Sequence, residues 1–305
     1  MRNQAIELAT QVSRAFVDNK GDGLLGLSFS SNNSVEPFPV ATPVENMIMQ
    51  DDIAPGSELF TTWLGNKFEP SFFTFGYIDE KALQGQKPVY TPIDKSSGAW
   101  ILESNVASIN GDLYSRPGNR ALADTGTTLC LVADSLCEKI YSAIPGATQS
   151  PAQQGWVFPT TTDLSTLPKI ALSVGDALFH VKPSDFAFQE LSDGTTYGGI
   201  QSRGHQDFDV LGCVFLRSIY AIFDQGNSRF GCTRRDLAPA TAVDTPSAHK
   251  GKLLELPPSP TDTSPLPKPT KGRRIRRIFS LSCCAGSSRP NSRSNSKVYQ
   301  DNLTP

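Results

Sequence analysis

Apolar residues fall into many short runs over the middle of the chain. Between about Leu59 and Gly231 these runs are separated by Gly, Pro, Asn and Asp, a pattern typical of β-strands joined by turns. Examples are LFTTWLG, SFFTFGYI, KPVYTPI, AWILES, KIALSV and YAIFD. The pattern predicts a mainly β domain.

Three segments instead have helical spacing. The first is residues 1–20, which predict a short amphipathic helix that ends at Asn19-Lys20-Gly21. The others are residues 133–144 (ADSLCEKIYSAI) and 214–220 (VFLRSIY), the latter between two strand-like runs. The apolar positions of the first segment are Ile6, Leu8, Ala9, Val12, Ala15 and Phe16.

Residues 21–26, Gly-Asp-Gly-Leu-Leu-Gly, fit the dinucleotide-binding pattern G-x-G-x-x-G. That pattern requires a strand before it and a helix after it. Here a helical pattern precedes and LSFSSNNS follows, so we reject a nucleotide site. We interpret Leu24 to Phe29 as a buried apolar strand in which a glycine permits close backbone approach.

Composition and charge change sharply near residue 237. The 305 residues are 38% hydrophobic, enough for a core, but the segment beyond residue 237 is rich in Pro, Ser, Thr and basic residues. Residues 250–305 carry 11 Lys and Arg against 3 Asp and Glu, and residues 1–249 carry 17 against 27. We expect residues 238–305 to be a disordered basic tail and the acidic folded part not to bind nucleic acid.

Membrane and export signals are not visible in the sequence. There is no run of 18 or more apolar residues, and the N-terminus lacks the apolar stretch of a signal peptide.

The cysteines and histidines favour neither metal binding nor nucleophilic catalysis. The six cysteines form no Cys-x-x-Cys pair, and none is grouped with the three histidines at metal-ligand spacing. No Gly-x-Ser-x-Gly elbow is present. We therefore expect no metal and no cofactor, and any catalysis should depend on carboxylates.

One carboxylate stands out. Residues 121–129, Ala-Leu-Ala-Asp-Thr-Gly-Thr-Thr-Leu, place Asp124 at the end of an apolar run, followed by hydroxyls and a glycine. Asp-Thr-Gly alone is a common turn. A second element, residues 209–212 (Asp-Val-Leu-Gly), precedes a short helix and Ile-Phe-Asp at 222–224. Asp209 and Asp224 lack the hydroxyl and glycine neighbours of Asp124, and we interpret them as turn or strand-end residues.

This combination resembles the C-terminal lobe of pepsin-like aspartic endopeptidases, especially secreted fungal ones. The similarity covers roughly residues 1–235. It includes QAIELA, DGLLGLSFSS, FTFGYID, SGAWILES, GWVFP, TLPKIAL, GGIQS and VLG-x-VFLR-x-x-YAIFD besides Asp124-Thr-Gly-Thr-Thr. The resemblance implies the pepsin-like fold with one complete, closed or barrel-like β lobe, part of the other lobe and short helices.

The resemblance also implies roles for single residues. Asp124 would be one of two carboxylates that share a proton and activate a water against a peptide carbonyl. Thr125 would link the two catalytic turns, Gly126 would allow their close approach, and Thr127 would donate to Asp124. Leu122 and Thr128 are candidates for walls of the substrate pocket. Leu24-Leu25-Gly26 and Val210-Leu211-Gly212 would each back one turn.

The sequence departs from the family in having a single catalytic motif. No second Asp-Thr-Gly and no Asp-Ser-Gly is present. We therefore interpret residues 1–40 as a remnant of the N-terminal lobe and 41–237 as the C-terminal catalytic lobe, with the rest of the first lobe missing from a truncated sequence. The expected partner is a protein or peptide substrate. The alternative is a catalytically inactive, protease-like binding protein that uses its basic tail for membrane or partner contact.

Cysteine positions also differ from the family pattern. Thr160 and Thr196 stand where fungal relatives commonly have the cysteines of a disulfide. Cys213 and Cys232 are candidates for a new bridge, whereas Cys130 and Cys137 could be a disulfide or buried thiols.

Two expectations concern location. Residues 271–284, which contain four arginines and Cys283-Cys284, could contact an anionic membrane surface or form a solvated linker. The family resemblance implies an extracellular or vacuolar protein.

Overall fold

The computed structural model describes residues 1–12, 14–18, 21–66, 69–235 and 253–256. Within these residues the chain is mainly β, as the sequence predicts, with short helices. Residues 271–284, with Cys283 and Cys284, lie outside the described residues, so the membrane prediction stays a prediction.

The strands form three sheets, and no pairing among the described strands closes a sheet on itself. The largest has the order β15 (Ile200–Ser202), β8 (Cys130–Val132), β16 (Asp209–Leu211), β7 (Arg120–Ala123), β4 (Ile101–Glu103), β3 (Val89–Asp94), β18 (Arg229–Arg234), β17 (Ile219–Asp224), β1 (Leu59–Trp63) and β2 (Phe72–Phe75).

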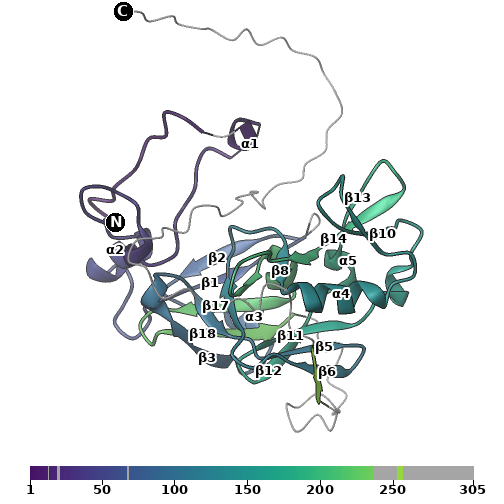
Figure 1. Ribbon diagram of the computed structural model, residues 1–305. Helices are drawn as coiled ribbons and strands as arrows, with labels where there is room; N and C mark the ends of the chain where they lie inside the picture. The colour runs from purple at the N-terminus through teal and green to yellow at the C-terminus, as the bar shows by residue number, and fades with distance from the viewer. Residues whose placement is uncertain (13, 19–20, 67–68, 236–252, 257–305) are drawn as a thin grey trace, which may run out of the picture.

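The two smaller sheets flank it. One has the order β13 (Ala187–Glu190), β14 (Thr195–Gly198), β10 (Gly155–Pro159) and β9 (Thr148–Ser150). The other has the order β12 (Ala177–His180), β11 (Ile170–Val174), β5 (Val106–Ile109), β6 (Asp112–Ser115) and β19 (Leu253–Glu255). In Figure 1 the four-stranded sheet lies beside α4, and β5 and β6 lie at the lower edge of the body.

The helices are short. Helix α2 begins with a capping box, in which Thr42 Oγ1 accepts from Glu45 N at 3.4 Å and Glu45 Oε2 accepts from Thr42 N at 2.9 Å. The helices are α1 (Arg14–Val17), α2 (Pro43–Met49), α3 (Glu80–Leu83), α4 (Asp134–Ser142), α5 (Pro183–Phe186) and α6 (Cys213–Leu216), with 3-10 turns at Ser30–Asn32, Lys95–Ser97 and Leu164–Thr166.

Of the two helices predicted within the β domain, one is confirmed and the other is partly wrong. Helix α4 confirms the prediction over 133–144, and it buries Leu136, Cys137, Ile140 and Tyr141 on one face. The predicted helix over 214–220 was partly wrong, because Ile219 and Tyr220 already belong to β17.

The expectations for the N-terminal segment were wrong. Only α1 is helical within residues 1–12 and 14–18, and Leu24 to Phe29 form no strand. Leu8 is 88% exposed and Leu24 is 70% exposed, whereas Phe29 is buried. A short helix is marginal in water without tertiary packing, and α1 lies on a loop away from the body (Figure 1). The first residues contact the α2 region, since Met1 N lies 3.0 Å from Asp52 Oδ2 and Gln4 Nε2 donates to Ala41 O at 3.3 Å. After the α1 loop the chain meets the sheet at Leu27, whose carbonyl accepts from Trp100 Nε1 at 2.9 Å.

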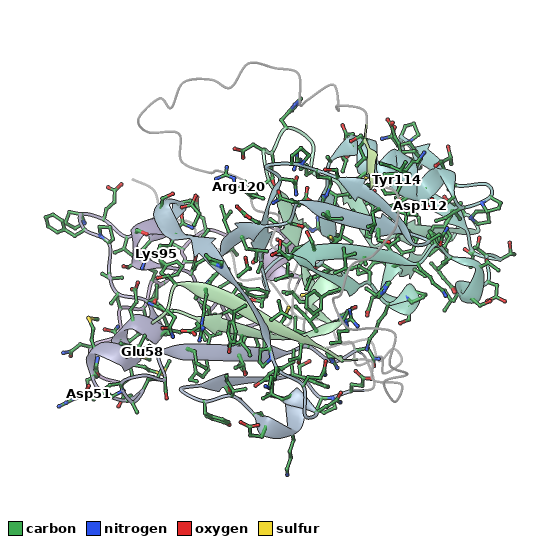
Figure 2. All side chains as sticks on the ribbon, turned by 90° about the horizontal axis from the view of Figure 1, so that it is seen from below. Asp51, Glu58, Lys95, Asp112, Tyr114 and Arg120 are labelled. Carbon is green, nitrogen blue, oxygen red and sulfur yellow. The ribbon has the colours of Figure 1, made fainter. Side chains whose placement is uncertain are left out.

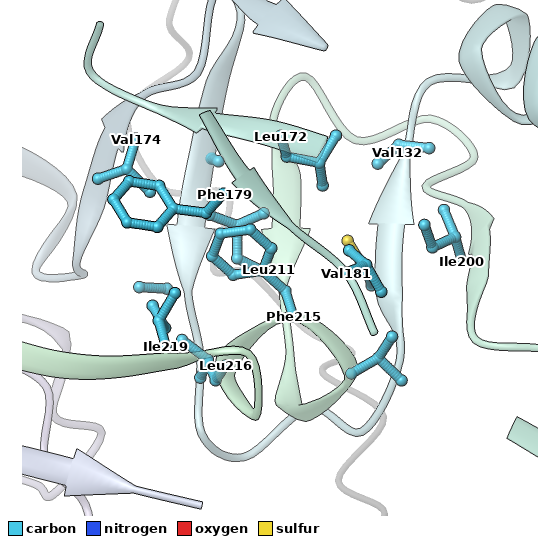
Figure 3. Close-up of a cluster of buried hydrophobic side chains, with 14 of the residues drawn as sticks. Val132, Leu172, Val174, Phe179, Val181, Ile200, Leu211, Phe215, Leu216 and Ile219 are labelled. Atoms are coloured by element: carbon cyan, nitrogen blue, oxygen red, sulfur yellow. The ribbon is translucent and has the colours of Figure 1, made fainter. Parts of the chain in front are cut away.

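A single large core joins the layers. Figure 3 shows side chains from β8, β11, β12, β15, β16 and α6 packed together, including Leu211, Phe215 and Leu216. Burying a side chain such as Phe215, which has no exposed surface, contributes about 2–3 kcal/mol relative to exposure. This packing anchors β16 and α6, which lie beneath the Asp124 loop.

Part of the predicted disordered tail is ordered. Leu253–Glu255 form β19, which pairs in parallel with β6, and Leu254 and Leu256 pack against the core. For these residues the expectation of disorder was wrong, because two leucines at alternate positions give the segment an apolar face. The remainder of the tail lies outside the described residues.

Charged residues lie over the outer surface of the folded part. Figure 2 shows Asp112 and Tyr114 of β6 at the opposite end of the body from Asp51 and Glu58. Among the described residues, no helix combines the length and apolar composition needed to cross a bilayer.

Candidate active site

Asp124 lies where strand β7 ends and the chain turns toward β8. Strand β7 lies between β4 and β16, and it pairs with β16 in parallel over Ala121 to Ala123. The Asp124 amide donates to Leu211 O at 3.2 Å, so the backbone of the turn is attached to the neighbouring strand. The half-buried Asp124 therefore directly follows the end of a central strand.

The Asp124 carboxylate is held by its own turn. Gly126 N donates to Oδ1 at 2.8 Å, and Thr127 Oγ1 donates to Oδ2 at 2.6 Å. Thr127 is buried and Gly126 is exposed. Because each oxygen has a donor on one side, the carboxylate keeps a fixed orientation while remaining accessible to solvent. Such an oriented carboxylate can accept or donate a proton.

Two glycines lie in close contact within this geometry. A Cβ on Gly126 would lie 3.1 Å from Asp124 Oδ1, a tight contact with the carboxylate. A Cβ on Gly212 would lie 2.1 Å from Leu129 O and 2.5 Å from Thr127 O. The turn and the β16–α6 corner therefore touch through their backbones, and a side chain at Gly212 would push them apart.

The corner after β16 also satisfies the turn's carbonyls. Cys213 N donates to Thr127 O at 2.8 Å, and Val214 N donates to Thr128 O at 3.0 Å. Cys213 Sγ lies 3.5 Å from Thr125 O. The expectation that Val210-Leu211-Gly212 backs the turn after Asp124 thus agrees with the contacts. Leu24-Leu25-Gly26 backs no described element, and both of its leucines are exposed.

The remaining site predictions are not tested by these contacts. Leu122 is half-buried in β7 and packs against the core. Thr128 is half-buried and contacts α6 through its carbonyl. The predicted substrate contacts of Leu122 and Thr128 stay predictions. The predicted link between two turns through Thr125 also stays a prediction. A hollow of about 310 Å³ lies elsewhere, between Ser108, Lys169, His180 and Arg234.

The four cysteines of the described residues are buried thiols, and none of them is in a disulfide. The bridge suggested between Cys213 and Cys232 is therefore not formed, and Cys130 and Cys137 are thiols. Burial raises the pKa of the Cys130, Cys137 and Cys232 thiols, so these groups stay protonated and are poor nucleophiles. The described residues also contain no group of three or more His, Cys, Asp and Glu placed to hold a metal ion.

Sequence reasoning missed the role of one acidic residue. Asp209 is fully buried and forms ion pairs with Arg116 and Arg203, so it is more than a strand-end residue. The only sequence signal was an Asp directly before an apolar pair. Asp224 conforms to its interpretation, since it ends β17 and accepts from Asn227 N at 3.0 Å in the following turn.

Comparisons with known proteins identify the family. A profile of the family described as "Eukaryotic aspartyl protease" matches residues 1–235. The chain is 36% identical over 230 residues to Aspergillopepsin-1 of Aspergillus pseudoglaucus, covering 75% of this chain and 56% of that protein. It is 38% identical over 232 residues to Penicillopepsin-1 of Talaromyces stipitatus, covering 75% of this chain and 57% of that protein.

The chain spans little more than half the length of these relatives. It extends over the strand that carries Asp124, the turn and the β16–α6 corner. The resemblance seen in the sequence motifs is confirmed by the profile and by the identity to curated fungal proteins: this chain belongs to the eukaryotic aspartyl proteases.

Proposed function

We propose that this chain supplies one of the two catalytic carboxylates of an aspartic endopeptidase. The observation that carries the proposal is the Asp124 carboxylate, which is fixed by Gly126 N and Thr127 Oγ1 at the exposed end of a buried strand. Family membership supports the same reading. The substrate is then a protein or peptide, and the reaction is hydrolysis of a peptide bond.

The reaction needs a second carboxylate close to Asp124. Two carboxylates a few ångströms apart cannot both ionise, so they share one proton and titrate as a pair. The ionised member takes a proton from a water whose oxygen attacks the peptide carbonyl, while the protonated member donates to the carbonyl oxygen. Transfer of a proton to the amide nitrogen then allows the C–N bond to break. Asp124 would serve in one of these two roles.

The second carboxylate would come from a unit that this sequence does not contain. The sequence has a single Asp-Thr-Gly and no Asp-Ser-Gly, and the matched relatives are considerably longer. We propose an N-terminal lobe as that unit, with residues 1–40 as its last part. In support, Leu24 and Leu25 are 70% and 62% exposed, and apolar side chains at such a position would be covered by a neighbouring lobe.

The finer expectations about location rest on the relatives. The matched proteins are fungal pepsin-like proteases, and on this basis we propose an extracellular or vacuolar location. We also propose weak contact of the basic residues 271–284 with an anionic membrane surface. That proposal rests on sequence alone, because these residues are not among those described.

The proposal is tested by cleavage of an unfolded protein substrate at acidic pH by the native protein from its source. We expect pepstatin-sensitive cleavage that Asp124→Asn abolishes and that Asp193→Asn, a change in an exposed turn, leaves unaltered. Pepstatin-insensitive or absent cleavage would contradict the proposal and would favour a binding protein. The 305-residue chain assayed alone should be inactive, since a single carboxylate cannot be acid and base in one step.

A further inference from the structure

A buried ionic network lies beside the catalytic strand. Asp209 opens β16 and has no exposed surface. Its Oδ1 accepts from Arg203 Nη1 at 2.9 Å, and its Oδ2 accepts from Asn119 Nδ2 at 3.0 Å and from Arg116 Nη1. Both arginine side chains are at least nine-tenths buried.

The network joins segments that are far apart in sequence. Arg116 Nη2 donates to Ser104 O at 2.9 Å and to Ser104 Oγ at 3.0 Å. Arg203 Nη1 also donates to Asn119 Oδ1 at 2.9 Å. The end of β4, the β6–β7 turn, the segment after β15 and the start of β16 are thus tied to one carboxylate.

Stability alone is a poor explanation for this network. Removing two guanidinium groups and a carboxylate from water costs several kcal/mol per ion, which the attraction between them offsets only with very good geometry. Here Arg116 Nε is buried with no hydrogen-bond partner among the described residues. Apolar side chains of similar volume often stabilise such a site equally well. The network is better understood from what it positions.

Strand β16 positions the Asp124 turn. It pairs with β7 over three residues, with Asp209 opposite Ala121 and Leu211 opposite Ala123. Leu211 O then accepts from Asp124 N, and Gly212 fits beneath the turn. A slip of a short strand would move every one of these contacts. Val210 and Leu211 could pack in a shifted register, but Asp209 meets both arginines in one register only.

We propose that Asp209 is a positioning residue for the catalytic turn: its pairing with Arg116 and Arg203 fixes β16 against β7, so that Leu211 O holds the Asp124 backbone in place. The consequence for catalysis rests on the proposed function. The consequence for the Asp124 turn does not, and it can be measured without any activity.

The test replaces the whole network by apolar side chains, with Arg116→Met, Arg203→Met and Asp209→Leu in one variant. Removing only one partner would leave an unpaired buried charge, which can unfold the domain. The matched control is Arg120→Met with Asp207→Asn. Arg120, the first residue of β7, also forms an ion pair, with 3.2 Å between its Nη2 and Asp207 Oδ2, but both side chains are exposed.

We expect the triple variant to keep cooperative unfolding while the amides of Asp124 and Gly126 exchange with solvent about tenfold faster or more, and the control to match the parent. In the full native protease, kcat should fall about tenfold or more with KM changed less than about twofold. A folded triple variant with parental exchange at both amides would overturn the proposal, whether or not the parent is active. Inactivity of the parent protease, with faster exchange in the variant, would instead remove only the proposed function.

A second variant covers failure of the triple variant to fold. Arg203→Lys keeps the charge but cannot reach both Asp209 and Asn119 with one planar group. Amide exchange at Asp124 and Gly126 should then rise several-fold relative to amides in β12, a strand that is not part of the network. Equal changes in all three places would show general destabilisation and would overturn the positioning role.

Discussion

The hydroxyl groups of Thr160 and Thr196 lie 3.3 Å apart, one just after β10 and the other in β14. These are the two positions at which the family resemblance places a disulfide. Thr160 N also donates to Gly194 O at 3.0 Å, which holds the end of β10 beside the β13–β14 turn. Two threonines thus occupy a site whose geometry brings the paired positions together.

The double variant Thr160→Cys/Thr196→Cys should therefore form a disulfide under oxidising conditions. Closing the intervening loop in the unfolded chain should raise the free energy of unfolding by about 3–4 kcal/mol. The measurement is urea unfolding with and without reductant, with Thr160→Cys alone as the control. An oxidised double variant with two more free thiols than the oxidised parent would contradict the prediction.

Gly212 should tolerate no side chain. Because its Cβ would lie 2.1 Å from Leu129 O, Gly212→Ala should lower the free energy of unfolding by about 1–3 kcal/mol and displace the Asp124 turn. The control is Gly26→Ala, since a Cβ there meets nothing within 4 Å, and it should change stability by less than about 0.5 kcal/mol. The measurement is the free energy of unfolding in urea. Equal values for the two variants would contradict the prediction, because they would show that the β16–α6 corner can move to accommodate a methyl group.

Thr127 should be needed for its hydroxyl group. Thr127→Val keeps the shape but removes the donor to Asp124 Oδ2, a hydrogen bond to a charged group worth about 1.5–3 kcal/mol. In the native protease kcat should fall about 10–100-fold. Thr127→Ser retains the donor and should stay within a few-fold of the parent. Equal kcat values for the valine and serine variants would exclude this role.

Asp185 should make folding stability depend on pH. Burial raises the pKa of this carboxyl above its usual 3.8, although Arg217 opposes the shift. The folded state therefore binds a proton more tightly than the unfolded state, and this contribution to stability is lost as pH rises from about 3.8 through the raised value. Asp185→Asn removes that loss, so its stability relative to the parent should increase with pH over this window.

The measurement for Asp185 is urea unfolding from about pH 2 to about pH 6, a window that also covers the region below 3.8. Asp193 offers a control of opposite sign, since hydrogen bonds from Thr195 lower the pKa of its exposed carboxyl. Asp193→Asn should lose stability relative to the parent as pH rises from the lowered value to 3.8, and the difference should stay constant above it. A pH-independent difference between Asp185→Asn and the parent would refute the prediction.

Strand β19 should protect β6. Leu254 and Leu256 are half-buried against the core, so Leu254→Ala/Leu256→Ala should release the strand and speed amide exchange in Leu113 to Ser115. The loss of apolar contact should cost about 1–3 kcal/mol. Leu164→Ala, at a side chain 46% exposed, is the control. Unchanged exchange in β6 would mean that β19 contributes no protection there.

The sequence by itself determined the features that depend on local pattern. Alternating apolar runs with turn residues predicted most strands of the body, and the apolar face of residues 133–144 predicted α4. The hydroxyls and glycine after Asp124 marked the candidate catalytic turn, because the hydrogen bonds within it to Asp124 span only two or three residues.

Tertiary structure decided the rest. Asp209 meets Arg116 across 93 residues of chain, and no local pattern distinguishes that pairing from a solvated strand end. Helical spacing in residues 1–20 did not produce a long helix, because an amphipathic face forms a stable helix only where something packs against it. Leu254 became part of a sheet because β6 offered a free edge. Local sequence pattern predicts a helix or strand. Whether that helix or strand forms depends on the burial of its apolar face or the pairing of its charges.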